Sequence, residues 1–221
     1  MSQTITKNNL DNRKLFGVFS LLASISAFLL LFLTLIQKPP QQNELLIHIE
    51  SHKGIYILFA GLSLTWSIIS IPVIIAIGFL AKRLEQVALT YTSIVLTSAG
   101  ILLSGIISFI SIAVSLVVVS TKSISGANVD FEITFWSNLF YYLTDPALMI
   151  WGLGQFLIGL QLLKLSIFPK WVNLLILSGG IAGLLTLIVF QTTALAIFQH
   201  LTFLILTTYS CIHFFRKQNA T

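Results

Sequence analysis

ALTYTSIVLTSAGILLSGIISFISIAVSLVVVS, residues 88–120, runs without a single charged side chain. The hydrocarbon core of a bilayer is about 30 Å thick, and a helix crosses it with about 20 mostly apolar residues. This stretch therefore predicts a membrane-spanning helix. Because the stretch is longer than one crossing requires, we expect the helix to tilt or to project beyond the bilayer.

Five further apolar runs extend this prediction to the whole chain. They cover residues 15–36, 54–80, 137–163, 171–190 and 195–215. Of the 221 residues, 56% are hydrophobic and only 9% are charged, whereas about 25% are charged in a soluble domain. Too few polar side chains remain to cover a surface that faces water. The sequence predicts an all-α, polytopic transmembrane bundle of six helices, with residues 1–221 as a single domain embedded in the lipid bilayer.

The basic residues predict the orientation of this bundle. If the N-terminus is inside, the inner segments carry nine Lys and Arg residues and the outer segments carry three. The inner ones are Lys7, Arg13, Lys14, Lys82, Arg83, Lys164, Lys170, Arg216 and Lys217. Cytoplasmic segments are enriched in Lys and Arg, so both termini are expected in the cytoplasm of a plasma-membrane protein. The net charge of +5 then reports topology, and no nucleic-acid partner is expected.

Small residues predict where the helices pack most closely. Helices in lipid associate through van der Waals contact, so small side chains at helical spacing mark interfaces. The expected packing positions are Gly100, Ser104 and Ser108, then Gly152 and Gly159, then Gly179 and Gly183. The runs 88–120, 137–163 and 171–190 should therefore form the tight centre of the bundle.

Asp145, in YYLTDPALMIWGLGQ, has two interpretations. A carboxylate inside a membrane is costly, so by default it indicates a ligand-binding or proton-binding group. However, Asp followed by Pro is also typical of a helix start, with Asp as the N-cap and Pro at the first helical position. In the second interpretation, FWSNLFYYL before it would lie at the membrane interface.

His200 and Gln155 are the other candidates for binding a ligand or a proton. His200 lies about two turns into the 195–215 run and could share a depth with Asp145, forming an ion pair. Alternatively, a neighbouring carbonyl satisfies the buried imidazole. Gln155 could line the same outer-half cavity, or it could simply bridge two helices through a hydrogen bond.

LLIHIESHKG, residues 45–54, places His48, Glu50 and His52 within five positions. On a helix, His48 and His52 share a face and could bind one metal ion, but a third ligand would be needed. The spacing is not that of the H-E-x-x-H zinc motif. The apolar residues in this stretch instead favour an amphipathic helix at the membrane surface. Cys211 is the only cysteine, which excludes an internal disulfide and a cysteine-based zinc cluster.

A family resemblance is carried by LGQFLIGLQLLKLSIFPKWVNLLILSGGIAGLL, residues 153–185, and by LLIHIESHKGIYILFAGLSL, residues 45–64. The first stretch has a glycine-bearing span, a basic inner turn with Pro-Lys-Trp, and a span rich in small residues. The chain resembles the bacterial six-span membrane proteins catalogued as domain of unknown function 4386. The resemblance implies an integral membrane protein and carries over no catalytic residue.

Three functions remain open from the sequence. The first is a non-enzymatic membrane protein with a structural, accessory or partner-binding role, whose partner is a second copy or another membrane protein. The second is a small transporter or ligand receptor with a cavity around Asp145, Gln155 and His200. The third is a membrane-embedded metalloenzyme that uses His48 and His52. No nucleotide-binding loop, serine-hydrolase motif or cofactor signature is present, so no cofactor is expected.

Overall fold

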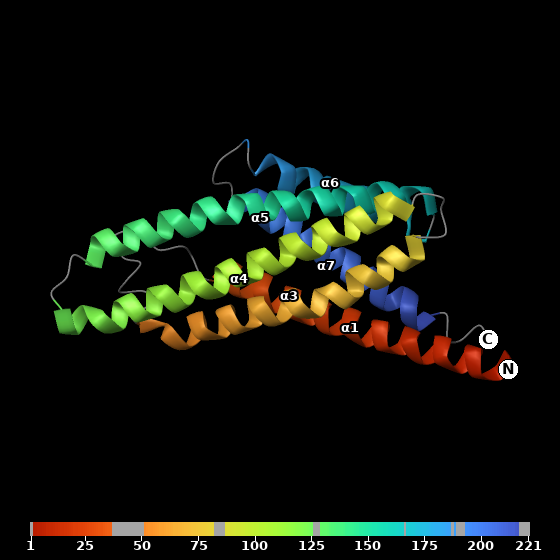
Figure 1. Cartoon of the computed structure of the whole chain (residues 1–221), viewed down its shortest axis with the longest axis horizontal. Helices are drawn as coiled ribbons and strands as arrows, with labels where there is room; N and C mark the ends of the chain where they lie inside the picture. Colours follow the sequence, from red (N-terminus) through yellow and green to blue (C-terminus); the bar gives the residue numbers. More distant parts are fainter. Residues whose placement is uncertain are drawn as a thin grey trace.

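The computed structural model describes residues 2–36, 51–81, 87–125, 129–165, 167–186, 188 and 193–216. Within these ranges the chain is helical, and the predicted all-α class is confirmed there. Figure 1 shows the helices α1 (Ser2–Ile36), α3 (Lys53–Ala81), α4 (Val87–Ser125), α5 (Val129–Leu165), α6 (Lys170–Leu185) and α7 (Thr193–Arg216).

Five of these helices, α1, α3, α4, α5 and α7, are long and apolar enough to cross a membrane. The sixth, α6, has 16 residues and so rises about 24 Å, less than the thickness of a hydrocarbon core. The predicted span 171–190 is therefore too long at its end. The helix ends at Leu185, and Thr186 follows as its C-cap: its amide donates to Ala182 O at 3.2 Å and its hydroxyl donates to Gly183 O at 2.7 Å.

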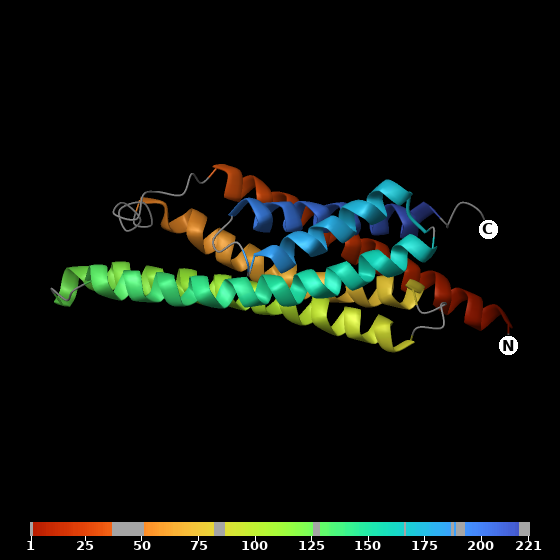
Figure 2. The same cartoon turned by 90° about the horizontal axis from the view of Figure 1, so that it is seen from above.

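The helices form a closed ring. Each helix packs against the next one along the chain, and α7 packs against α1. At this last junction Ser24 Oγ lies 3.0 Å from Thr207 Oγ1, and the ring of Phe16 lies 6.0 Å from that of Phe214. These two contacts show that α1 and α7 run antiparallel. The start of α1 and the end of α7 consequently lie at the same end of the bundle (Figures 1 and 2).

At the opposite end, α4 and α5 project beyond the other helices (Figure 2). They have 39 and 37 residues, or about 58 and 55 Å, far more than one crossing needs. Both exceed the predicted spans 88–120 and 137–163, because each helix continues outward as the partner of the other. This projection is relative to the other helices, so the expected tilt or projection of the 88–120 run beyond the bilayer stays a prediction.

Large apolar side chains are exposed on the outside of the ring, whereas its interior holds both polar and apolar side chains. Fully buried polar residues include Ser20, Ser67, Ser70, Ser93, Thr97, Thr202, Thr207 and Ser210, while Phe28, Ile57 and Val95 are among the most exposed side chains. Several buried hydroxyls donate to the carbonyl one turn earlier, as Thr97 does to Ser93 O at 2.7 Å. An apolar exterior around a partly polar interior is the arrangement that suits a lipid environment.

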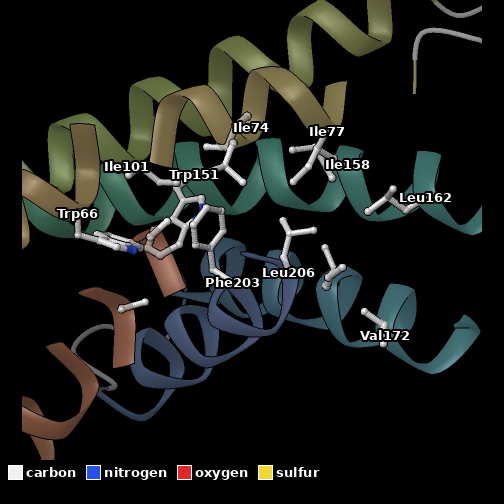
Figure 3. Packing of buried hydrophobic residues seen from close by; sticks show 14 of the residues in the cluster. Trp66, Ile74, Ile77, Ile101, Trp151, Ile158, Leu162, Val172, Phe203 and Leu206 are labelled. Carbon is white, nitrogen blue, oxygen red and sulfur yellow. The ribbon is translucent and has the colours of Figure 1, made fainter. Parts of the chain in front are cut away.

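The centre of the ring is filled by side chains from α3, α5 and α7. Trp66, Trp151 and Phe203 meet there, with ring centroids 5.4 to 5.7 Å apart, and Ile74 and Leu206 belong to the same buried cluster (Figure 3). All five side chains are at most 2% exposed. This cluster holds the sequence-distant helices α3, α5 and α7 together across the ring.

Candidate functional site

His200 lies against the aromatic cluster at the centre of the bundle. Its imidazole stacks on Trp66, with centroids 5.5 Å apart, and meets the face or edge of Trp151 at 4.7 Å in a T-shaped arrangement. Its Nδ1 lies 2.7 Å from Ala196 O. Because a carbonyl oxygen can only accept, Nδ1 carries a hydrogen and donates it. A neighbouring carbonyl therefore satisfies one nitrogen of this imidazole, which is one of the two alternatives left open by the sequence.

Asp145 is buried, but it does not pair with His200. The structure places neither a hydrogen bond nor an ion pair between these two described residues. His200 contacts the ring of Trp151, whereas Asp145 precedes Trp151 by six residues on α5, or about 9 Å along the helix axis. The expected Asp145–His200 pair is thus absent because the two residues lie at different depths.

Asp145 also does not cap a helix. The helix α5 continues through Pro146, so Asp145 lies in its interior and FWSNLFYYL is helical. Pro146 removes one amide donor, yet the helix persists because residues on either side pack along α4. The capping interpretation of Asp-Pro was therefore wrong, and Asp145 remains an 8% exposed carboxylic acid inside α5.

Gln155, Thr202 and Gln199 form a polar seam, a row of hydrogen-bonded side chains between α5, α6 and α7. Gln155 Nε2 donates to Thr202 Oγ1 at 2.8 Å and to Ile176 O at 3.3 Å. Thr202 in turn donates to Gln199 O at 2.8 Å, and Gln199 Nε2 donates to Leu148 O at 3.2 Å. Gln155 thus connects three helices through hydrogen bonds, as the interhelical alternative anticipated.

Two glycines of α6 make room for this seam. A β-carbon on Gly179 would overlap Thr202 Oγ1, and one on Gly183 would come within 2.6 Å of Gln199 Nε2. Any side chain at either position would displace the polar groups. The spacing of Gly179 and Gly183 therefore serves the seam as well as the approach of the helices.

Not every polar atom in and beside this seam has a hydrogen-bond partner among the described residues. Gln155 Oε1 and Gln199 Oε1 are buried without a hydrogen-bond partner, as are the indole nitrogens of Trp66 and Trp151. A buried polar atom without a partner costs about 1 to 3 kcal/mol. Two acceptors and two donors thus lie buried on the helices that meet at the centre, which is the chemistry expected where a small polar molecule or ordered water is held.

The remaining predicted packing positions lie at other contacts of α5. A β-carbon on Gly100 would overlap the backbone of Trp151, one on Gly152 would lie 2.8 Å from Gly183 Cα, and one on Gly159 would lie 2.9 Å from Leu177 Cα. Ser104 is buried and Ser108 is half-buried on α4. The backbone of α5 is therefore approached closely from both α4 and α6.

The metal-site hypothesis falls mostly outside the described residues. His48 and Glu50 are not among them, and neither is most of the amphipathic helix expected over residues 45–54. His52 is exposed, with its Nδ1 2.8 Å from Ser51 Oγ. Among the residues that the structure describes, no group of three His, Cys, Asp or Glu side chains could hold a metal ion.

Sequence reasoning missed Trp66, Trp151, Gln199 and Asn173. The two tryptophans lie in mid-span, away from the interfaces where tryptophan is enriched, and that position was a signal for the core. Asn173 is 1% exposed and donates from Nδ2 to Leu162 O at 2.9 Å and to Phe168 O at 3.3 Å. It thereby satisfies carbonyls at the end of α5, where the helix itself has no donors left.

No known protein family, curated protein or solved structure matches this chain.

Proposed function

We propose that this chain is a multi-pass protein of the bacterial plasma membrane that acts without catalysis, as a structural, accessory or partner-binding component. The observation that supports this role is the filled centre of the ring. Trp66, Trp151 and Phe203 are in mutual contact there and are at most 2% exposed. A centre packed with aromatic rings suits a scaffold that presents its outer surface to other membrane components.

The same proposal includes the orientation and the family. With α1 beginning and α7 ending at one end of the bundle, an even number of crossings would put both ends on the same side of the membrane, and we infer that this side is the cytoplasm. The excess of Lys and Arg at that end supports this orientation. The resemblance of residues 153–185 to domain of unknown function 4386 supports a bacterial membrane family, and it carries over no catalytic residue.

Photo-crosslinking in the native membrane tests the partner-binding role. A photoreactive residue would replace exposed apolar side chains on different helices, such as Phe28, Val95 and Leu174. We expect a discrete crosslinked protein from one face of the bundle and none from a control at buried Ile74. Crosslinks to lipid alone from every outer face would contradict the proposal.

A second function, a small-ligand receptor or transporter, is favoured by the unsatisfied Gln155 Oε1 and Gln199 Oε1. A ligand that binds the native state raises its stability by about 2.7 kcal/mol at a hundredfold excess over Kd. Thermal unfolding of the purified protein with a panel of small polar metabolites would detect it. Under this second function, a ligand raises the unfolding temperature of the wild type and not that of Gln155→Leu.

Gln161→Leu is the matched control for that experiment. Gln161 lies on the same helix and is 3% exposed, but it reaches toward α4, with Nε2 3.5 Å from Ser93 Oγ. A ligand response that survives in Gln161→Leu and disappears in Gln155→Leu would replace the scaffold role with the receptor role. Equal responses in both variants would exclude the seam as the binding site.

A further inference from the structure

A partly open cavity of about 160 Å³ lies where the connection between α5 and α6 meets the end of α7. Residues 167–169 form one wall. The other wall is formed by α7, through Tyr209, Ile212, His213 and Arg216. A water molecule takes up about 30 Å³ of liquid, so the cavity is large enough for a group of several heavy atoms.

The polar groups of this cavity suit an anion. Arg216 offers a guanidinium whose forked donors match phosphate oxygens, and Tyr209 offers a hydroxyl. The helix α6 begins just after Pro169, a lining residue, and no side chain caps that end. The dipole of α6 adds positive potential at this end of the helix.

No described carboxylate competes for these groups. Asp145 is the only acidic residue whose side chain the structure describes, and Leu165 at the end of α5 is 20 residues further along, or about 30 Å. Four further basic residues lie at the same end of the bundle as the cavity: Arg13, Lys14, Lys164 and Lys170.

The position of the cavity points to a lipid rather than a free anion. The stretches of α5 and α7 that are apolar enough to cross a membrane end at Lys164 and Arg216, so in a bilayer the cavity would lie near the level of the membrane surface. Exposed apolar side chains continue from it toward the bilayer interior along α6, with Trp171 and Leu174 52% and 54% exposed. Trp171 packs edge-on against Tyr209 with centroids 5.5 Å apart, as an interfacial anchor would.

We propose that this cavity binds the phosphate headgroup of an anionic phospholipid from the cytoplasmic leaflet. Arg216 and Tyr209 contact the phosphate oxygens, and the acyl chains lie along the exposed apolar face of α6. The choice of the cytoplasmic leaflet rests on the orientation proposed above, whereas the site itself requires no protein partner and no ligand at the centre of the ring.

Thermal unfolding of the full chain in detergent micelles doped with lipid tests the proposal. Phosphatidylglycerol should raise the unfolding temperature in a saturable manner, whereas phosphatidylcholine and millimolar inorganic phosphate should not. Arg216→Gln should raise the phosphatidylglycerol concentration needed for half of this effect by about fivefold, as the loss of one basic contact predicts. Lys14→Gln is the matched control: it removes one charge at the same end from a residue that does not line the cavity.

A variant that keeps every charge distinguishes binding of the lipid in the cavity from nonspecific electrostatic attraction of the anionic lipid to the basic end of the bundle. Ile212→Trp fills the space beside Arg216 and should also weaken the phosphatidylglycerol effect. The proposed site would be wrong if Lys14→Gln weakened the stabilisation by phosphatidylglycerol as much as Arg216→Gln does. It would also be wrong if Ile212→Trp left that stabilisation unchanged. If inorganic phosphate raised the unfolding temperature as much as phosphatidylglycerol does, the proposal of a lipid would be wrong, and the site would bind a free phosphorylated molecule instead. Circular dichroism without added lipid establishes that each variant is folded.

Discussion

Single residues show where this bundle departs from a simple apolar core. Asp145 is buried inside α5 with no hydrogen bond or ion pair to any described residue, and Asn173 on α6 completes the hydrogen bonding at the end of α5. Asp145 has no compensating partner among the described residues, whereas the Asn173 amide nitrogen donates two hydrogen bonds and only its Oδ1 is buried without a partner there. These two residues should therefore respond in opposite directions when their polarity is changed.

Replacing Asp145 with Asn should stabilise the protein. The amide keeps the shape of the side chain and removes the cost of a desolvated charge that has no cationic partner, which we expect to be worth about 1 kcal/mol this close to the membrane surface. The unfolding temperature in detergent measures the change, and Asp145→Glu, which keeps the charge, serves as the control. A clear loss of stability in Asp145→Asn would show that the carboxylate makes a favourable interaction, such as with a bound cation.

Replacing Asn173 with Leu should destabilise the protein by about 1 to 3 kcal/mol. The change leaves Leu162 O and Phe168 O buried without the donor that Asn173 Nδ2 provides. Gln161→Leu is the control, because its amide reaches Ser93 Oγ only at 3.5 Å. Unfolding titrations of the two variants should differ, and equal stability would show that Asn173 is not needed at this turn.

At the scale of elements, the contact between α5 and α6 depends on backbone-to-backbone approach. Gly152 meets Gly183, and Gly159 meets Leu177, with no side chain between the helices. Because α6 has only 16 residues, it can bury little surface along its length. The close approach of its backbone to that of α5 increases the contact made by each turn. A side chain added to α5 at this crossing could not avoid the contact by rotating, because the nearest atoms belong to the backbone of α6.

Gly152→Ala should therefore cost about 1 to 3 kcal/mol, the usual penalty of overpacking a tight contact. The new methyl group would lie 2.8 Å from Gly183 Cα, so the two helices would have to separate. Gly61→Ala on α3 is the matched control, because a β-carbon there meets nothing within 4 Å. Its unfolding temperature should stay the same or rise slightly, since Ala favours helix more than Gly does. Similar losses in both variants would contradict the importance of the α5–α6 crossing.

For the whole molecule, the ring of antiparallel helices predicts the number of membrane crossings. Although α6 is shorter than the bilayer is thick, α7 returns to the end where α1 begins. A chain that crossed only with its five long helices would have its ends on opposite sides. The ring therefore favours six crossings, and the placement of both ends in the cytoplasm stays a prediction.

Cysteine labelling tests this topology directly. Cys211 is the only cysteine, so Cys211→Ser gives a background into which single cysteines can be placed at Ser2, at Thr221 and at Ser51. A membrane-impermeant maleimide applied to intact cells should label Ser51→Cys and leave the two terminal variants unlabelled until the membrane is opened. Labelling of one terminus from the outside would mean that α6 does not cross.

The helical class and the positions of the long helices followed from the sequence, because lipid requires each spanning segment to be apolar and to satisfy its own backbone. The predicted runs 54–80 and 195–215 agree with α3 and α7 to within a few residues. The small residues at helical spacing predicted close packing of α4, α5 and α6, and the glycines do lie at such contacts, since they permit the approach of neighbouring backbones. They did not predict the centre of the ring, which is filled by side chains of α3, α5 and α7.

Only the tertiary structure decided which polar groups meet. The sequence left open whether Asp145 caps a helix or pairs with His200, and neither is found, because α5 continues through Pro146 and the two residues lie at different depths. Sequence reasoning did not predict that Trp66 and Trp151 fill the centre or that Gln155, Thr202 and Gln199 form one seam. Apolarity is a property of each segment and can be read along the chain, whereas pairing depends on how far each helix slides and rotates against its neighbours.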